Sequence, residues 1–176
     1  MYRAIVLGTL IAAAAVAGPA VSNDRFGHVD HFRAVLSGFN EVPAINSEGS
    51  GTVDVWLDRQ SMMLSYKVTF TGLSSNTTQS HIHLGKIHTA GSVIVFFCTN
   101  LTPPTGVPTP PACPLNGGTV SGSLSMADVL GVAAQNVKAG DFDAVEDALT
   151  SDTAYANVHS VNFPGGEIRG QLVRDF

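Results

Sequence analysis

The chain has 176 residues, a length that suits one domain with a sizeable hydrophobic core. Nine Lys and Arg residues against 14 Asp and Glu residues give it a formal charge of −5. This acidic balance argues against nucleic acid as a partner, because phosphate groups attract a basic surface.

The first 20 residues have the features of a secretory signal peptide. Arg3 is followed by an apolar run over residues 4–17 and then by Gly18-Pro19-Ala20. The run of about 14 residues is shorter than the ~20 that a bilayer-spanning helix needs, which disfavours a retained anchor. We therefore predict a signal peptide over residues 1–20, cleaved after Ala17 or after Ala20, a secreted or periplasmic product, and no membrane span in the mature chain.

Short segments with apolar residues at every second position follow along the chain. In residues 52–58, for example, Val53, Val55 and Leu57 share one face. Such alternation is typical of antiparallel strands with one buried face. The predicted strands cover residues 31–36, 52–58, 64–70, 79–84, 92–98, 119–125, 154–160 and 167–173. About eight short strands, separated by Gly, Pro, Asn and Ser, predict an all-β domain over residues 31–174 with a Greek-key-like sandwich or barrel.

One segment departs from this alternation. Ser125 has the character of a helix N-cap, with Asp128 three residues later. Apolar residues continue as far as Val137, and a second run begins after Gly140. The sequence therefore predicts a small insert of two short helices, over residues 126–137 and 141–149.

The chain contains two cysteines, Cys98 and Cys113. An exported chain with an even number of cysteines favours a disulfide, which here would close a proline-rich loop. A thiolate metal site is the alternative, but no further Cys or His lies at the short spacing that such sites use. We predict the Cys98–Cys113 disulfide.

Two histidine-bearing segments lie about 75 residues apart, His81-Ile82-His83 and His159. Because side chains alternate faces along a strand, His81 and His83 lie on one face while Ile82 points to the core. Val158 is expected to point to the core as well, which turns Asn157 and His159 outward. If the two strands are neighbours, these outward-facing histidines form a metal site.

Ligation by imidazole alone suits copper best and zinc less well. The predicted ligands are His81, His83 and His159, and His88 in the following loop is an optional fourth. The alternative is that these histidines are structural and form hydrogen bonds with the carbonyl groups of nearby turns.

Four segments of the chain carry a family resemblance: residues 32–43 (FRAVLSGFNEVP), 81–83 (HIH), 155–159 (YANVH) and 163–172 (FPGGEIRGQL). With these segments the chain resembles the CHRD domain family, which is named for chordin. The resemblance implies a secreted all-β domain and covers the chain from about residue 31 to residue 173. Growth-factor binding is not implied, because the chain lacks the cysteine-rich modules of chordin.

A looser similarity links the His-x-His pair and the distant His159 to the Greek-key fold of Cu,Zn superoxide dismutase. That similarity implies copper on the outer face of the barrel. The sequence departs from the dismutase pattern, since it has no second cluster of three histidines and an aspartate for zinc.

Three functions follow from these patterns. The favoured one is an exported protein that binds a metal ion, with copper preferred. The second is a non-catalytic extracellular module that binds another protein. The third is a redox enzyme of the dismutase type, and the missing zinc cluster makes an enzyme the less favoured reading.

Overall fold

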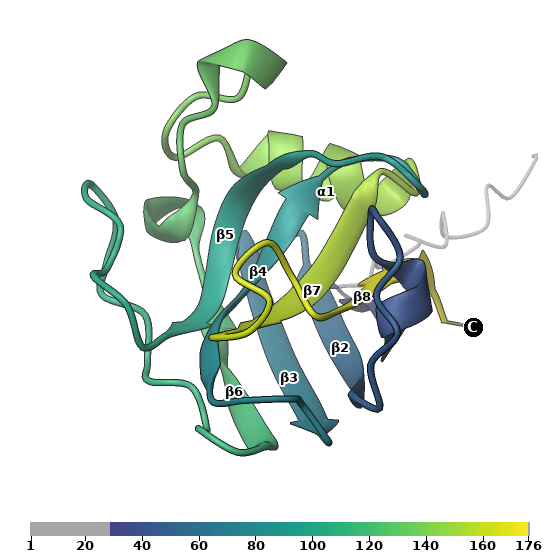
Figure 1. Ribbon diagram of the computed structural model, residues 1–176. Coiled ribbons are helices and arrows are strands. Elements are labelled where there is room, and N and C mark those ends of the chain that lie inside the picture. The colour runs from purple at the N-terminus through teal and green to yellow at the C-terminus, as the bar shows by residue number, and fades with distance from the viewer. Residues whose placement is uncertain (1–28, 176) are drawn as a thin grey trace, which may run out of the picture.

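A computed structural model describes residues 29–175, which form a nearly closed antiparallel β-barrel with one α-helix (Figure 1). The strands are β1 (Val29–Ser37), β2 (Ser50–Asp58), β3 (Met63–Thr71), β4 (Thr77–Leu84), β5 (Ser92–Thr99), β6 (Gly118–Leu124), β7 (Ala154–Ser160), β8 (Ile168–Gln171) and β9 (Val173–Arg174). The fold class predicted from the sequence is confirmed. The predicted signal peptide over residues 1–20 lies outside the described residues.

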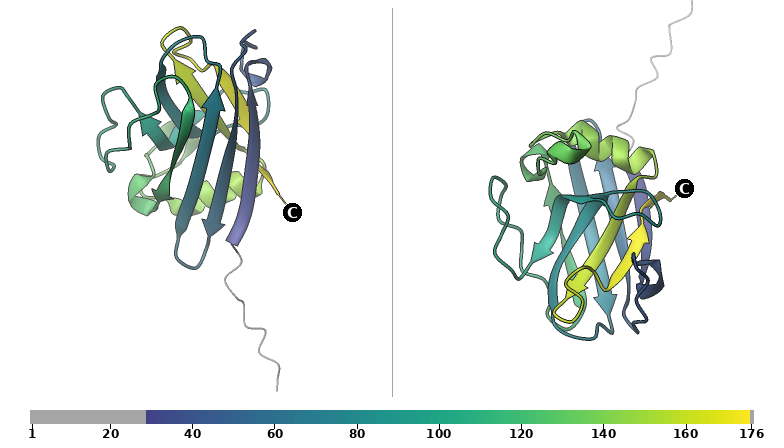
Figure 2. Two further views of the ribbon diagram at one scale, coloured as in Figure 1. Left: turned by 90° about the horizontal axis from the view of Figure 1, so that it is seen from below. Right: turned by 45° about the horizontal axis from the view of Figure 1, so that its top comes forward.

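The strand order around the sheet is β5-β4-β7-β8-β1-β2-β3-β6, with β9 paired to β1. Strands β1, β2 and β3 form a meander, whereas β3 pairs with β6 and β4 pairs with β7 across long connections. These non-consecutive pairs give the Greek-key-like order. Figure 2 shows the consecutive strands β1, β2 and β3 side by side in one wall of the barrel. The pairing of β4 with β7 brings together the two histidine-bearing segments.

The barrel interior follows the alternation seen in the sequence. In β2, Val53, Val55 and Leu57 are fully buried, and they belong to one continuous core with Ile82 and Val158. Burial of an aliphatic side chain of this size contributes about 1.5–3 kcal/mol to folding, so the alternating strands carry most of the driving force.

The predicted helical insert is half right. Helix α1 (Phe142–Thr150) matches the second predicted helix; the Asp141 side chain accepts from the Ala144 amide, and Val145 and Leu149 are buried. It closes one end of the barrel (Figure 2). Within residues 29–175, no helix combines the length and apolar character that a bilayer-spanning segment needs.

The helix predicted over residues 126–137 is wrong. The segment contains two 3₁₀ turns, Met126–Asp128 and Ala133–Gln135, which extended residues separate. Gly131 and the β-branched valines of this run have low helix propensity. Val132 instead pairs with Val137 across a tight turn in which Asn136 is left-handed, with φ 56°. Ser125 does cap the first turn, in a reciprocal capping box with Asp128.

The predicted disulfide between Cys98 and Cys113 is present, with a Cα–Cα distance of 5.1 Å. Asn100 reinforces the closure, because its side chain accepts from the Cys113 amide and donates to the Cys113 carbonyl. The bond ties the proline-rich loop to the end of β5.

We expect the Cys98→Ala/Cys113→Ala double variant to lose about 3 kcal/mol of unfolding free energy, because an open loop of this length restores entropy to the unfolded chain. The 15-residue separation of the two cysteines sets that estimate. Urea denaturation of the oxidised wild type and the variant measures the loss. Reduced wild type is the control and should match the variant. Equal stability of oxidised and reduced wild type would contradict the prediction.

Candidate metal centre

The three predicted histidines lie on two neighbouring strands, β4 and β7. In the antiparallel register His81 is opposite Asn157, His83 is opposite Tyr155, and Gln79 is opposite His159. Since residues opposite each other share a face, these side chains all lie on the outer face of the sheet. Ile82 and Val158 belong to the hydrophobic core, as the alternation predicted. The register therefore places the histidines side by side.

The three histidines lie on the outer face, as predicted, but they are not exposed to solvent. The exposed fractions are 1% for His81, 8% for His83 and 5% for His159. Two loops lie over the outer face: residues 85–91 bring the Gly91 carbonyl against His83, and the loop after β7 brings the Pro164 carbonyl against His159. Figure 1 shows the second loop turning back in front of β4 and β7. The histidines face away from the barrel interior and are nevertheless buried.

The imidazole rings converge. One nitrogen from each of His81, His83 and His159 lies within 4.8 Å of the others. The ring of His81 is central, since its centroid lies 5.3 Å from that of His83 and 4.7 Å from that of His159. Among residues 29–175, this histidine triad is the single group of three or more His, Cys, Asp or Glu side chains placed to hold a metal ion.

Backbone carbonyls fix the tautomers of two rings. His83 Nδ1 lies 2.9 Å from the Gly91 oxygen, and His159 Nδ1 lies 2.9 Å from the Pro164 oxygen. A carbonyl oxygen accepts hydrogen bonds only, so both Nδ1 atoms carry the hydrogen and both Nε2 atoms present a lone pair. Metal-binding histidines are commonly oriented in this way. Such carbonyl contacts are expected of structural histidines, but they also orient the two rings so that each Nε2 lone pair could bind a metal.

Several buried nitrogens of the triad lack a partner. Neither ring nitrogen of His81 forms a hydrogen bond, and neither does His159 Nε2. A buried polar group without a partner costs about 1–3 kcal/mol, so such groups point to a missing ligand or ion.

Burial also keeps the rings uncharged. It lowers the pKa of His81 well below 6.5, with further lowering by the neighbouring His159 and His83. Burial lowers the pKa of His83 to about 4 and also lowers the pKa of His159. At neutral pH the triad therefore presents neutral imidazoles, the form that binds metals.

Aromatic and cationic groups pack around the triad. Tyr155 stacks on His83 with a centroid distance of 4.5 Å, and the Arg169 guanidinium carbon lies 3.4 Å from the Tyr155 ring centroid. Arg169 also donates to the Lys86 and Thr89 carbonyls of the 85–91 loop. On the other side, Phe96 contacts His81 edge-on at 4.4 Å. Strand alternation places Tyr155 on the face of Asn157, but sequence reasoning did not select it.

His88 does not join the triad. It lies in the exposed turn of the 85–91 loop, where its backbone is left-handed with φ 61°. The loop contributes the Gly91, Lys86 and Thr89 carbonyls to the site and leaves His88 at the surface.

A model of the CHRD domain family matches residues 32–172. The chain belongs to the CHRD domain family. The comparison with curated proteins found no match, and neither did the comparison with solved structures. The matched CHRD segment contains all three triad histidines and both loops that cover them. CHRD membership indicates an extracellular or periplasmic module, and the disulfide is consistent with an oxidising compartment.

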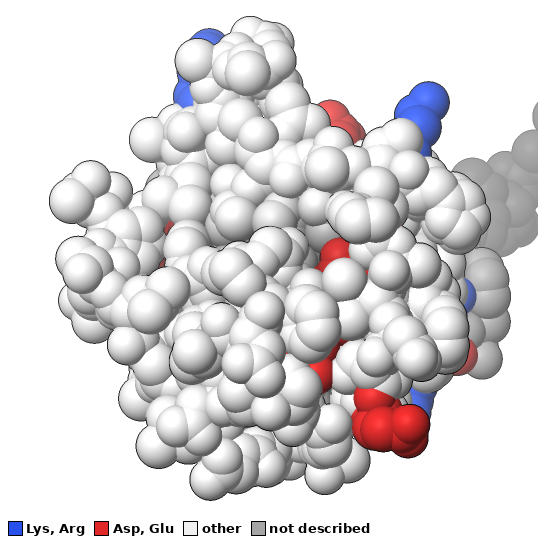
Figure 3. Space-filling model, viewed as in Figure 1, with Lys and Arg blue, Asp and Glu red and all other residues white. Residues whose placement is uncertain are grey.

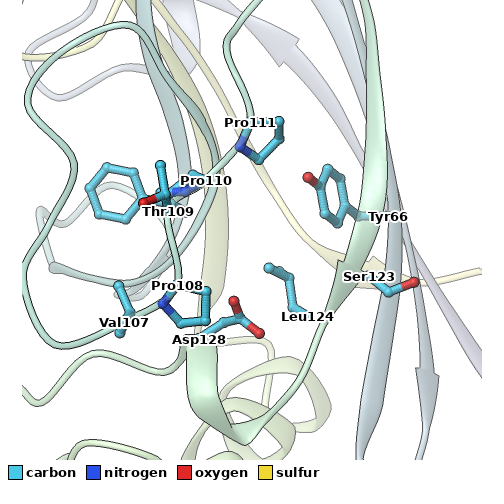
Figure 4. Close-up of a pocket in the computed structure, with 10 residues that line it drawn as sticks. Tyr66, Val107, Pro108, Thr109, Pro110, Pro111, Ser123, Leu124 and Asp128 are labelled. Carbon is cyan, nitrogen blue, oxygen red and sulfur yellow. The ribbon is translucent and has the colours of Figure 1, made fainter.

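The surface over β4 and β7 carries few charges, as Figure 3 shows from the viewpoint of Figure 1. A cavity of about 220 Å³ lies to one side, between the proline-rich loop and the edges of β3 and β6 (Figure 4). Phe96 lines this cavity and also contacts His81, so its ring is shared by the cavity and the triad. Tyr66 lies at the cavity's inner side and donates to the Phe97 carbonyl at 2.7 Å. The cavity therefore adjoins the triad and lies outside it.

We expect the metal-free CHRD domain to lose stability as the pH falls from about 6.5 to about 4. The native-state pKa of His83 is lowered to about 4, so the unfolded chain binds the proton first and is favoured in this window. For His83 alone the loss is about 3 kcal/mol.

Urea denaturation at a series of pH values, with a chelator present, measures this loss. His83→Gln should reduce the acid-induced loss by about that amount, whereas His88→Gln, at an exposed position, should behave as wild type. Parallel stability curves for wild type and His83→Gln would contradict the assignment.

Proposed function

We propose that this CHRD-domain protein binds one transition-metal ion, copper in preference to zinc, through His81, His83 and His159 in an exported protein. The observation that carries the proposal is the convergence of three buried neutral imidazoles, with ring nitrogens of His81 and His159 left without partners. A metal ion would satisfy these nitrogens and remove the cost of leaving them unpaired.

The donor set fits such an ion in chemistry and in approximate size. Imidazole nitrogen suits copper and zinc, and the Irving–Williams order favours copper(II). Two nitrogens bound to one ion at about 2.0–2.1 Å lie at most about 4.2 Å apart. The nitrogens of the triad lie within 4.8 Å of one another, so the widest pair must close by up to about 0.6 Å on opposite sides of an ion, or by up to about 1.4 Å at a tetrahedral angle. Small rotations of the side chains supply this.

The burial of the triad favours holding an ion over turning over a substrate. Structural metal sites are closed by protein ligands, whereas catalytic sites keep a position open to solvent or substrate. Here no triad histidine is more than 8% exposed. The CHRD domain therefore suits storage, sequestration or stabilisation by a metal better than dismutase-type chemistry.

A second candidate function is an extracellular module that binds another protein. The observation in its favour is exposed apolar surface at β1 and the turn after it, where Val35 is 65% exposed and Phe39 is 68% exposed. Scattered apolar residues are common on monomer surfaces, so this observation is weaker than the buried triad.

We expect metal-free wild type to bind one equivalent of copper(II) and His83→Ala to bind it at least tenfold more weakly, because loss even of a residue that only orients a metal ligand typically costs 10–100-fold in affinity. Isothermal titration calorimetry with copper(II) and zinc(II) measures both affinities. His88→Ala is the matched control, since His88 is an exposed histidine of the same chain, and it should bind as wild type.

Repeating the titration at falling pH sharpens the test. Protons compete for the ligand nitrogens, but burial lowers the histidine pKa values, so binding should persist below about pH 6.5 and fail towards about pH 4. Weak copper(II) binding by wild type, or equal affinity of wild type and His83→Ala, would contradict the proposed metal binding and favour the second candidate function, binding of another protein.

We further expect the exported product to begin after Ala17 or after Ala20. The apolar run over residues 4–17 is short for a membrane span and ends in small residues, the pattern that signal peptidase recognises. Intact-mass spectrometry of protein from the periplasm or the culture medium identifies the mature N-terminus. Recovery of chains that still begin with Met1, in the membrane fraction, would contradict this expectation.

A further inference from the structure

Asn157 makes an unusual contact with the triad. Its side-chain oxygen Oδ1 lies 3.0 Å from His83 Nε2, in the buried part of the site. The Gly91 carbonyl requires the hydrogen of a neutral His83 ring to be on Nδ1, so Nε2 carries a lone pair. An amide oxygen also offers lone pairs only. Two acceptor atoms therefore face each other at hydrogen-bond distance without a hydrogen between them.

Turning the amide over would let its NH2 group donate to His83 Nε2, but it would move the conflict to Glu41. The Asn157 amide nitrogen lies towards Glu41: a Cβ added to Gly166 would meet both Glu41 Oε1 and Asn157 Nδ2. The amide beside the Glu41 carboxyl group counteracts the rise in the Glu41 pKa that burial causes. The reversed orientation would place Oδ1 against that carboxyl oxygen. The nearby Glu41 carboxyl group, itself only 8% exposed, thus favours the orientation that directs the amide oxygen at His83.

The backbone holds Asn157 in this place. In the sheet register it is directly opposite His81, and the Ser80 hydroxyl donates to its backbone carbonyl at 2.8 Å. Gly166 lets the loop after β7 approach Asn157 closely, since a side chain at this position would collide with Asn157 and Glu41. The oxygen is therefore fixed beside the converging imidazoles.

We infer that the Asn157 side-chain oxygen is the fourth ligand of the metal ion, completing a site of three imidazole nitrogens and one amide oxygen. This inference rests on the proposed function of the triad. Two ligand atoms that lie about 2.1 Å from one ion, at a right angle, are about 3.0 Å apart. That is the distance between His83 Nε2 and Asn157 Oδ1. A bound cation turns the contact between two acceptors into two attractive contacts.

The fourth ligand also bears on which oxidation state the site prefers. Amide oxygen is a hard ligand that suits divalent ions, whereas copper(I) prefers soft sulfur ligands. With Asn157 in place, the site should bind copper(II) and zinc(II) and should discriminate against copper(I).

The test compares Asn157→Leu and Asn157→Asp with wild type, by copper(II) calorimetry and by electron paramagnetic resonance of the copper(II)-loaded proteins. Asn157→Leu removes the oxygen and should weaken copper(II) binding about 10–100-fold while changing the copper spectrum. Asn157→Asp keeps an oxygen at that place and should retain tight binding with a shifted spectrum. Thr78→Val, a change of similar size in β4, is the control and should match wild type in both measurements.

The outcomes separate this inference from the proposed function. If wild type binds copper(II), His83→Ala loses it and Asn157→Leu keeps both affinity and spectrum, Asn157 is no ligand and the triad stands alone. If His83→Ala binds as well as wild type, the proposed function fails and this inference with it. Should Asn157→Leu fail to fold by circular dichroism, Asn157→Asp decides, because a carboxylate ligand must change the copper spectrum. An unchanged spectrum overturns the inference.

Discussion

The candidate site depends on the antiparallel register between β4 and β7. Because His81 is opposite Asn157, four side chains that could serve a metal share the outer face, while Ile82 and Val158 fill the barrel core. A slip of one residue would reverse these faces and place imidazoles in the apolar interior. Burial of the aliphatic side chains therefore fixes the position of the histidines as firmly as any contact among the histidines themselves.

A buried carboxylate, that of Glu167, holds in place the loop after β7, which covers His159. Glu167 is fully buried and accepts from the Ser47 hydroxyl at 2.7 Å, from the amide and hydroxyl of Ser74 and from the Ser160 hydroxyl. Burial alone would raise the Glu167 pKa, but these hydrogen bonds outweigh it and lower the pKa. Three segments of the chain, around residues 47, 74 and 160, thus form hydrogen bonds with the same Glu167 carboxylate. The Pro164 carbonyl that orients His159 lies in the loop between Ser160 and Glu167.

The sequence predicted those features that depend on alternation and local chemistry. Alternation in β2, β3 and β7 identified the strands and the faces of Ile82 and Val158, and the cysteine count identified the disulfide. The helix predicted over residues 126–137 is absent. The apolar spacing there is compatible with a helix, but Gly131 and the valines have low helix propensity, which the prediction did not take into account. The burial of the triad could not be predicted, since it depends on two loops that reach the site from different parts of the chain. The pairing of β4 with β7 could not be predicted either, because it depends on the order of all the strands in the sheet.

The charges around the triad bear on how the proposed site would hold a divalent ion. The three imidazoles and the Asn157 amide are uncharged. The cation Arg169 packs on the ring of Tyr155 and is held by loop carbonyls. Glu41 is the carboxyl group next to Asn157; burial raises its pKa while Arg169 opposes that rise by attraction. A divalent ion beside Asn157 would attract the Glu41 carboxylate more strongly still and favour its ionised form. Glu41 Oε1 and three imidazole nitrogens are buried without hydrogen-bond partners. Such groups are unfavourable on their own and would be stabilised by a bound cation, so metal binding and folding of the CHRD domain are coupled in this proposal.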